Sequence, residues 1–162
     1  MTEKKGYLKT IFVNKNTIYA LSFFLFTFLL SIYIAQFYVS GDQFHYIEFY
    51  ELSKGLSLLD TYILQLTSIG SADPGYSLII WLSSNFISKN LLISLANASL
   101  AVLLFKILRK FKYPTWFFVG VLLSFYMFVL FFAAERLKFA AILILIAFFY
   151  KTFFTRALII LL

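Results

Sequence analysis

The sequence predicts an all-α protein, a polytopic integral membrane helical bundle whose outer-face loop contains short amphipathic helices. First, 62% of its 162 residues are hydrophobic and only 13% are charged, whereas a typical soluble domain is about 25% charged. Second, long apolar runs alternate with short basic clusters. Third, residues 41–76 form a polar segment that holds five of the seven acidic residues and the single histidine. These features indicate one membrane domain over residues 1–162.

The composition also limits the chemistry of the chain. There is no cysteine and only one histidine, His45, which excludes disulfides, thiol catalysis and a His-rich metal site. No glycine-rich phosphate loop or nucleophile elbow is present, so we expect neither a metal nor a cofactor. The formal net charge is +7, but the basic residues lie between hydrophobic spans. The positive-inside rule explains these positions, and we expect no nucleic acid partner.

The first predicted span covers residues 18–38. Four lysines precede it, Lys4, Lys5, Lys9 and Lys15. A span of about 21 residues suits a membrane-crossing helix better than the apolar core of a signal peptide, which is roughly 7–15 residues long. We therefore interpret it as an uncleaved anchor that follows a cytoplasmic N-terminus.

An outer loop is predicted over residues 39–90. Within it, residues at helical spacing indicate a short helix over 44–58 with Gly55 near its end, and a second apolar piece follows over 60–66. Asp73 and the proline after it are typical of an N-cap and the first position of a further helix.

That further helix, over 74–88, decides the predicted topology. At about 15 residues it is short for a crossing. If it crossed together with the next span, 91–108, the basic cluster that follows would lie outside and violate the positive-inside rule. That cluster consists of Lys106, Arg109, Lys110 and Lys112. We therefore place 74–88 at the outer surface.

Further spans are predicted over 116–134 and 135–150, and Lys151 and Arg156 follow them on the inner side. An incomplete span over 157–162 comes last, because about six residues at 1.5 Å each cannot cross ~30 Å of hydrocarbon. We therefore expect the chain to be the N-terminal part of a longer protein.

Asp42, directly after the first span, is one candidate for chemistry. A carboxylate just outside the membrane can accept the proton of a sugar hydroxyl as a general base. The alternative is that Asp42 is the N-cap of the following helix, a position that aspartate favours. The sequence alone favours the cap.

Arg136 is the second candidate. It lies between two apolar runs, beside Glu135 and Lys138, at the outer membrane edge in this topology. A charge within a span costs about 2.5 kcal/mol or more and is functional by default, and a guanidinium matches the geometry of phosphate. The alternatives are that Arg136 reaches to the interface or pairs with Glu135.

Together these motifs resemble the EpsG/Wzy-type family of bacterial polysaccharide polymerases. Asp42 precedes Tyr46 by four residues in the outer loop, and the run 73–76 (Asp-Pro-Gly-Tyr) is similar to the family's Glu-Pro-Gly-aromatic sequence. A basic turn over 109–112 follows the next span. Arg136 opens a later span with an alanine four residues on, like the family's Arg-Gln-x-x-Ala. The resemblance covers most of the chain.

The resemblance implies a glycosyltransferase-type enzyme of the bacterial inner membrane that makes O-antigen, capsule or exopolysaccharide. Its substrate is an oligosaccharide repeat unit carried on undecaprenyl diphosphate, and its other partners are the lipid bilayer and a chain-length regulator. Asp42 would be the base, and Arg136, helped by Lys138, would bind the leaving diphosphate. Tyr46 and Tyr76 would bind the substrate. We expect the chain to be inactive without the later spans of the family.

Two alternatives stay open. A transporter or flippase segment for lipid-linked sugars would use the same cationic edge without forming a bond, and it would be favoured if repeat units accumulated inside the cell. A small structural membrane protein would have no chemistry of its own.

Overall fold

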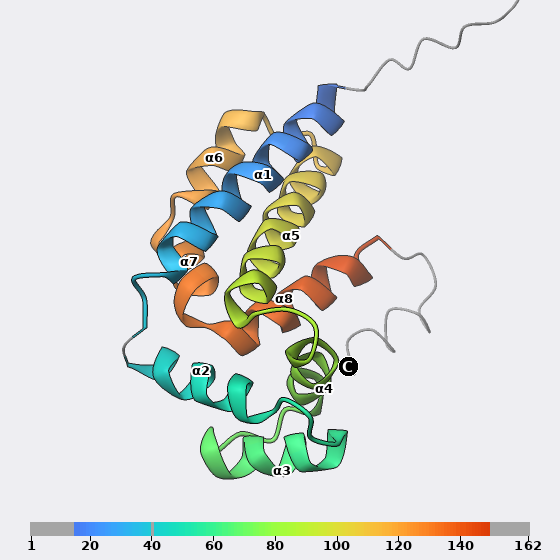
Figure 1. Ribbon diagram of the computed structural model, residues 1–162. Coiled ribbons are helices and arrows are strands. Elements are labelled where there is room, and N and C mark those ends of the chain that lie inside the picture. Colours follow the sequence, from blue (N-terminus) through green and yellow to red (C-terminus); the bar gives the residue numbers. More distant parts are fainter. Residues whose placement is uncertain (1–14, 40, 150–162) are drawn as a thin grey trace, which may run out of the picture.

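The computed structural model describes residues 15–39 and 41–149. Over these residues the chain is all-α, with eight α-helices, one π-helical turn and no strand (Figure 1). Two helices are long and apolar enough to cross a membrane, α1 (Lys15–Ala35) and α5 (Lys89–Lys110), and a bent helix pair is a third candidate. The all-α class is thus confirmed, and these helices suggest a membrane location.

Several predicted features lie outside the described residues. They are the incomplete span 157–162, the basic residues Lys151 and Arg156, and the lysines Lys4, Lys5 and Lys9.

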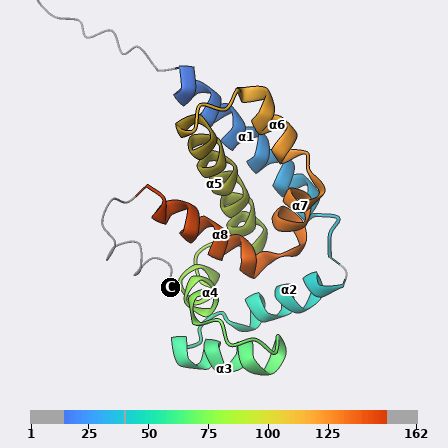
Figure 2. The same cartoon turned by 180° about the vertical axis from the view of Figure 1, so that it is seen from behind.

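α1 and α5 lie side by side and antiparallel (Figures 1 and 2). Their bounds match the predicted spans 18–38 and 91–108 to within about one helical turn of 3.6 residues. The outward face of α1 is apolar, and Phe26 and Leu29 are each 64% exposed. Such a face suits contact with lipid tails rather than water. On α5, Ala98 and Ala101 are fully buried, and small residues let two membrane helices approach closely.

The predicted span 116–134 is not one straight helix. It is divided into α6 (Thr115–Leu122), α7 (Phe125–Phe128) and the π-helical turn η1 (Val129–Ala133). The chain bends by 63° after α6. α7 begins after its N-cap, Ser124, whose side chain accepts a hydrogen bond from the Met127 N–H. The run stays apolar through this serine, so its hydropathy did not reveal the bend.

Three short helices form a cap, residues 42–84, over the end of the bundle where α1 ends and α5 begins (Figure 1). They are α2 (Asp42–Leu52), α3 (Leu58–Ser68) and α4 (Pro74–Ser84). The predicted helix 44–58 ends early because Gly55 turns the chain with a φ of +77°. The piece predicted over 60–66 is longer than expected and begins after Ser57, whose side chain caps α3. α4 begins as predicted but ends four residues before Ser88.

Buried aromatic residues hold the cap together, and Phe49 and Tyr50 of α2 pack with Tyr76 of α4. The Gly55 N–H donates to Asn85 Oδ1 at 2.9 Å. The two ends of the α3–α4 hairpin therefore lie next to each other. With 11 residues, α4 is about 17 Å long, well short of the ~30 Å hydrocarbon core. α4 is therefore too short to cross a membrane as a helix.

α8 (Glu135–Ala147) crosses α5 obliquely (Figures 1 and 2). The predicted span 135–150 has the right first residue, but the helix contains only 13 residues. At about 20 Å it does not by itself cross ~30 Å of hydrocarbon. A sharp turn at Ala134, with φ −94° and ψ 69°, separates α8 from η1 and sets the start of α8 against the cap.

Candidate functional site

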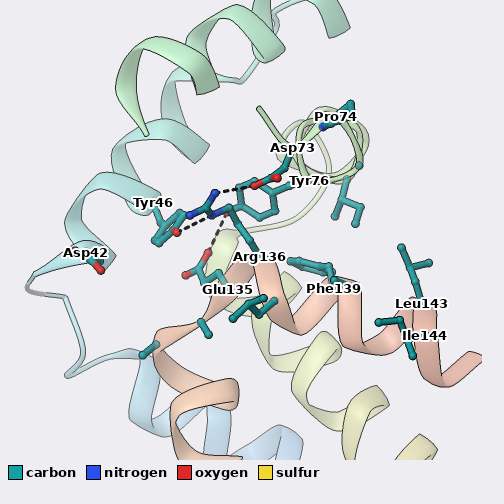
Figure 3. Close-up of a pocket in the computed structure, with 16 residues that line it drawn as sticks. Asp42, Tyr46, Asp73, Pro74, Tyr76, Glu135, Arg136, Phe139, Leu143 and Ile144 are labelled. Carbon is teal, nitrogen blue, oxygen red and sulfur yellow. Dashed lines mark hydrogen bonds and ion pairs between the residues drawn. The ribbon is translucent and has the colours of Figure 1, made fainter. Parts of the chain in front are cut away.

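A cavity of about 720 Å³ lies between the cap and the start of α8 (Figure 3). Residues of α2, the first two turns of α4, the end of η1 and α8 line it. Four of the five predicted site residues are among them: Asp42, Tyr46, Tyr76 and Arg136. These four come from three helices that are far apart in the sequence. The fifth, Lys138, lies away from the cavity lining.

Arg136 reaches from the first turn of α8 to two residues of the cap. Its Nε donates to the Tyr46 hydroxyl at 3.2 Å, and its Nη1 donates to Asp73 Oδ2 at 2.7 Å (Figure 3). The side chains of Arg136 and Asp73 are 38% and 50% exposed. An exposed ion pair contributes about 1 kcal/mol or less to stability. The Asp73 carboxylate can therefore be replaced at Arg136 by another anion at little cost.

Asp73 is the N-cap of α4, as predicted, but its side chain makes no capping hydrogen bond because Arg136 binds the carboxylate. Asp42, in contrast, is not the N-cap of α2. Gly41 holds that position with a φ of +65°, and Asp42 lies in the first turn. The capping interpretation of Asp42 is therefore wrong. Glycine adopts positive φ readily. Gly41 therefore takes the non-helical N-cap position, and Asp42 becomes the first residue of the helix.

Asp42 and Tyr46 lie one turn apart on α2, and both line the cavity. In Figure 3, Tyr46 lies between Asp42 and Arg136. Asp42 is exposed, and its carboxylate has no hydrogen bond or ion pair with any described residue. This carboxylate is therefore available to a ligand in the cavity.

A buried polar network lies next to the cavity. Glu135 Oε1 pairs with Lys89 Nζ at 2.6 Å, and Glu135 Oε2 accepts a hydrogen bond from the Tyr76 hydroxyl at 3.1 Å. The Lys89 ammonium also donates to Gln43 Oε1 at 2.9 Å. Glu135 is 1% exposed, and Lys89 is 8% exposed. Lys89 therefore compensates the charge of Glu135, and the alternative pairing of Glu135 with Arg136 does not occur.

Two side chains bind carbonyl groups at the end of η1. Lys138 Nζ donates to the Phe131 carbonyl at 2.5 Å, and Gln43 Nε2 donates to the Phe132 carbonyl at 3.2 Å. The last carbonyls of a helix have no partner within that helix, so these bonds satisfy them. Lys138 is fully buried. Its position supports the turn between η1 and α8.

Tyr76 joins the network to the cavity, because its ring lines the cavity while its hydroxyl binds Glu135. Burial raises the pKa of Tyr76 well above its ordinary value of 10.0, and the charge of Glu135 raises it further. Tyr76 therefore stays neutral and keeps its proton for the hydrogen bond.

One wall of the cavity is apolar. Phe139, Leu143 and Ile144 follow Arg136 along α8, and Ile79 of α4 completes the wall. Figure 3 shows these α8 side chains extending away from the polar cluster around Arg136. The cavity thus joins a cationic, hydrogen-bonding end to an apolar wall, which suits an amphipathic anion.

Sequence reasoning missed Lys89, Gln43 and the pairing role of Glu135. A signal was present in the predicted topology. The predicted topology places Lys89 at the outer membrane edge, where the positive-inside rule expects few lysines. It places Glu135, an acid between two apolar runs, at the same edge. Opposite charges at one depth beside apolar spans are expected to pair, because an uncompensated buried charge is costly.

No family model, curated protein or solved structure matches this chain. Among the described residues, no group of three or more His, Cys, Asp or Glu side chains could hold a metal ion. The chemistry of the cavity is therefore inferred from its own residues.

Proposed function

We propose that this protein polymerises lipid-linked oligosaccharide repeat units into a surface polysaccharide at the outer face of the bacterial inner membrane. The observation that carries the proposal is the cavity, which combines the partly exposed Arg136 guanidinium, the Asp42 carboxylate, which has no partner among the described residues, and an apolar wall. Each of these matches one part of a polyprenyl diphosphate sugar. The resemblance of the motifs at Asp42, 73–76 and Arg136 to EpsG/Wzy-type polymerases supports the same function.

In this proposal the diphosphate binds at Arg136. Its planar donors suit two phosphate oxygens, and the diphosphate takes the place of the Asp73 carboxylate. The Nη2 group makes no hydrogen bond to any described residue, so it adds donors for the ligand. The first isoprene units of the lipid then lie along Phe139 and Leu143.

The reaction is a substitution at the anomeric carbon. A hydroxyl oxygen of the acceptor sugar forms the new bond to that carbon, while the bond from carbon to the diphosphate oxygen breaks and the diphosphate keeps the electron pair. Asp42 takes the hydroxyl proton as a general base. Arg136 stabilises the charge that develops on the leaving diphosphate. Tyr46 holds the Arg136 guanidinium in place through its hydroxyl.

The test uses Asp42→Asn and Arg136→Ala in the gene that encodes this chain, in its own host. Polymer length and yield are measured at equal protein levels, and we expect each variant to lose about 10²-fold or more of the yield. Glu48→Gln is the control for Asp42, because Glu48 is an exposed acid on α2 outside the cavity lining, and Lys54→Ala is the control for Arg136. If both cavity variants make polymer of normal length and yield, the site assignment fails.

The location of unpolymerised repeat units separates this function from transport. Repeat units that accumulate at the outer face in Arg136→Ala cells support polymerisation. Repeat units retained at the inner face identify a transport step instead. A normal repeat-unit pool together with normal polymer leaves only a structural role.

A further inference from the structure

A second groove, of about 470 Å³, lies at the opposite end of the bundle, between the start of α1 and the end of α5. Its walls are mainly apolar, with Leu21 and Phe24 from α1 and Val102 and Phe105 from α5. Lys106 and Arg109 line the same groove. The positive-inside rule assigns this end of the bundle to the cytoplasm.

Among the described residues, the cations at this end have no acidic partner. The three ion pairs of the described residues all involve the cap or the residues that contact it, and they are Glu51–Lys54, Lys89–Glu135 and Asp73–Arg136. None includes the described basic residues of the groove end, which are Lys15, Lys106, Arg109, Lys110 and Lys112. The C-terminus of α5 contributes a partial charge of only about −0.5. This partial charge does not neutralise five cations.

Arg109 has a donor without an acceptor. Its Nη1 donates to the Tyr113 carbonyl at 3.0 Å, whereas its Nε is buried and has no hydrogen-bond partner in the described part of the chain. A buried donor without a partner costs free energy. The Arg109 side chain lines the groove together with Lys106, so an anionic oxygen held in the groove would pair with both cations.

We propose that this groove binds an anionic phospholipid of the cytoplasmic leaflet. The phosphate lies against Lys106 and Arg109, and an acyl chain follows the apolar walls. A lipid fits better than a soluble phosphate, because most of the lining is apolar. The N-terminal residues 1–14 are a poor occupant, since they carry three lysines and one glutamate. Basic pockets between membrane helices on the cytoplasmic side bind anionic lipid headgroups in other proteins.

The proposal is independent of the polymerase chemistry, because the groove and the cavity lie at opposite ends of the bundle. The test uses the purified full chain in detergent. Native mass spectrometry measures how much phosphatidylglycerol the protein retains and compares this with the amount of phosphatidylcholine retained. Lys106→Gln/Arg109→Gln removes the two cations of the groove. Lys110→Gln/Lys112→Gln removes the same charge from the same end without changing the groove lining.

We expect the groove variant to bind phosphatidylglycerol roughly 30-fold more weakly, since each cation contributes about fivefold. The control variant should weaken it by no more than about threefold, because its charges act only through screened attraction. Equal losses in the two variants, or equal binding of phosphatidylcholine by the unchanged protein, would overturn the proposal.

Thr17→Trp tests the apolar part of the groove without removing a charge. Thr17 is exposed and lines the groove, so the indole occupies its mouth while the fold is kept. We expect phosphatidylglycerol binding to fall about tenfold through lost apolar contact. Unchanged binding in this variant, or displacement of the lipid by soluble glycerol phosphate, would show that the groove selects only a phosphate and would contradict the lipid assignment.

Discussion

At the residue scale, the ion-pair partner of Glu135 is set by its position in the fold and not by its neighbour in the sequence. Its neighbour in sequence is Arg136, yet its partners in the structure are Lys89 and Tyr76. Successive residues of a helix point in different directions, so Glu135 enters the buried network while Arg136 enters the cavity. Arg136 consequently pairs with the exposed Asp73 carboxylate of the cap and not with Glu135.

We predict that Lys89→Met destabilises the protein by about 3–5 kcal/mol, because it leaves the buried Glu135 without its ion-pair partner. Reversible unfolding in mixed micelles measures the change. Lys54→Met is the matched control, since Lys54 belongs to an exposed ion pair that contributes about 1 kcal/mol or less. The double variant Lys89→Met/Glu135→Leu should regain most of the loss. Equal effects of the two single variants would contradict the compensating role of Lys89.

Tyr76 leads to a prediction about pH. Its folded-state pKa is raised above 10.0 by burial first and by Glu135 second. Its contribution is therefore fully present below about pH 10 and is lost as the pH rises through the folded-state pKa. Tyr76→Phe should cost about 1.5–3 kcal/mol at pH 8, and its deficit relative to the unchanged protein should shrink above about pH 10.

Thermal unfolding between about pH 8 and pH 11 measures this convergence. Tyr126→Phe is the control, because Tyr126 is 83% exposed and should follow the unchanged protein throughout. A deficit of Tyr76→Phe that stays constant across this range would refute the link to titration.

At the element scale, the hydrophobicity of the sequence located the two long helices but not the break within the predicted span 116–134. α1 and α5 match their predicted spans because hydrophobicity over about 20 residues is enough to define a crossing helix. The 116–134 span divides at Ser124, where one side-chain cap outweighs a continuous apolar pattern. Two carbonyl groups near its end accept hydrogen bonds from Lys138 and Gln43. Neither residue belongs to this span, so a hydropathy profile of the span does not reveal these bonds.

The contact between α1 and α5 includes a buried hydrogen bond, from Asn97 Nδ2 to Ser31 Oγ at 2.7 Å. We predict a coupling free energy of about 0.6 kcal/mol, and no more than about 1.7, in a double-mutant cycle of Ser31→Ala and Asn97→Ala. Unfolding in mixed micelles provides the four free energies. A cycle of Thr27→Ala with Asn97→Ala is the control, since Thr27 is buried on α1 without a bond to Asn97. Coupling as large in the control cycle would argue against this hydrogen bond.

At the scale of the whole molecule, the two ends differ in how their charges are paired. Among the described residues, the cap end holds the acidic residues and all three ion pairs, whereas the cations of the other end have no acidic partner. This separation supports the predicted orientation, because unpaired lysine and arginine accumulate on the cytoplasmic side.

The absence of cysteine from the chain makes the topology directly measurable. We predict that Lys54→Cys and Phe86→Cys react with a membrane-impermeant maleimide from outside intact cells, whereas Lys112→Cys reacts only after permeabilisation. All three positions are exposed. Residues 54 and 86 flank the α3–α4 hairpin, whose ends meet through Gly55 and Asn85. Labelling of positions 54 and 86 from opposite sides would mean that 74–88 crosses the membrane.

By itself, the sequence determined the helical class, the two long apolar helices and the concentration of five of the seven acidic residues in residues 41–76. These follow from hydrophobicity and charge, which are properties of short continuous stretches. Only the tertiary structure decided that Arg136 meets Asp73, 63 residues away, that Lys89 neutralises Glu135, and that Lys138 is turned away from the cavity. The choice among several possible partners depends on distance and burial, and these exist only once the cap has folded against α8.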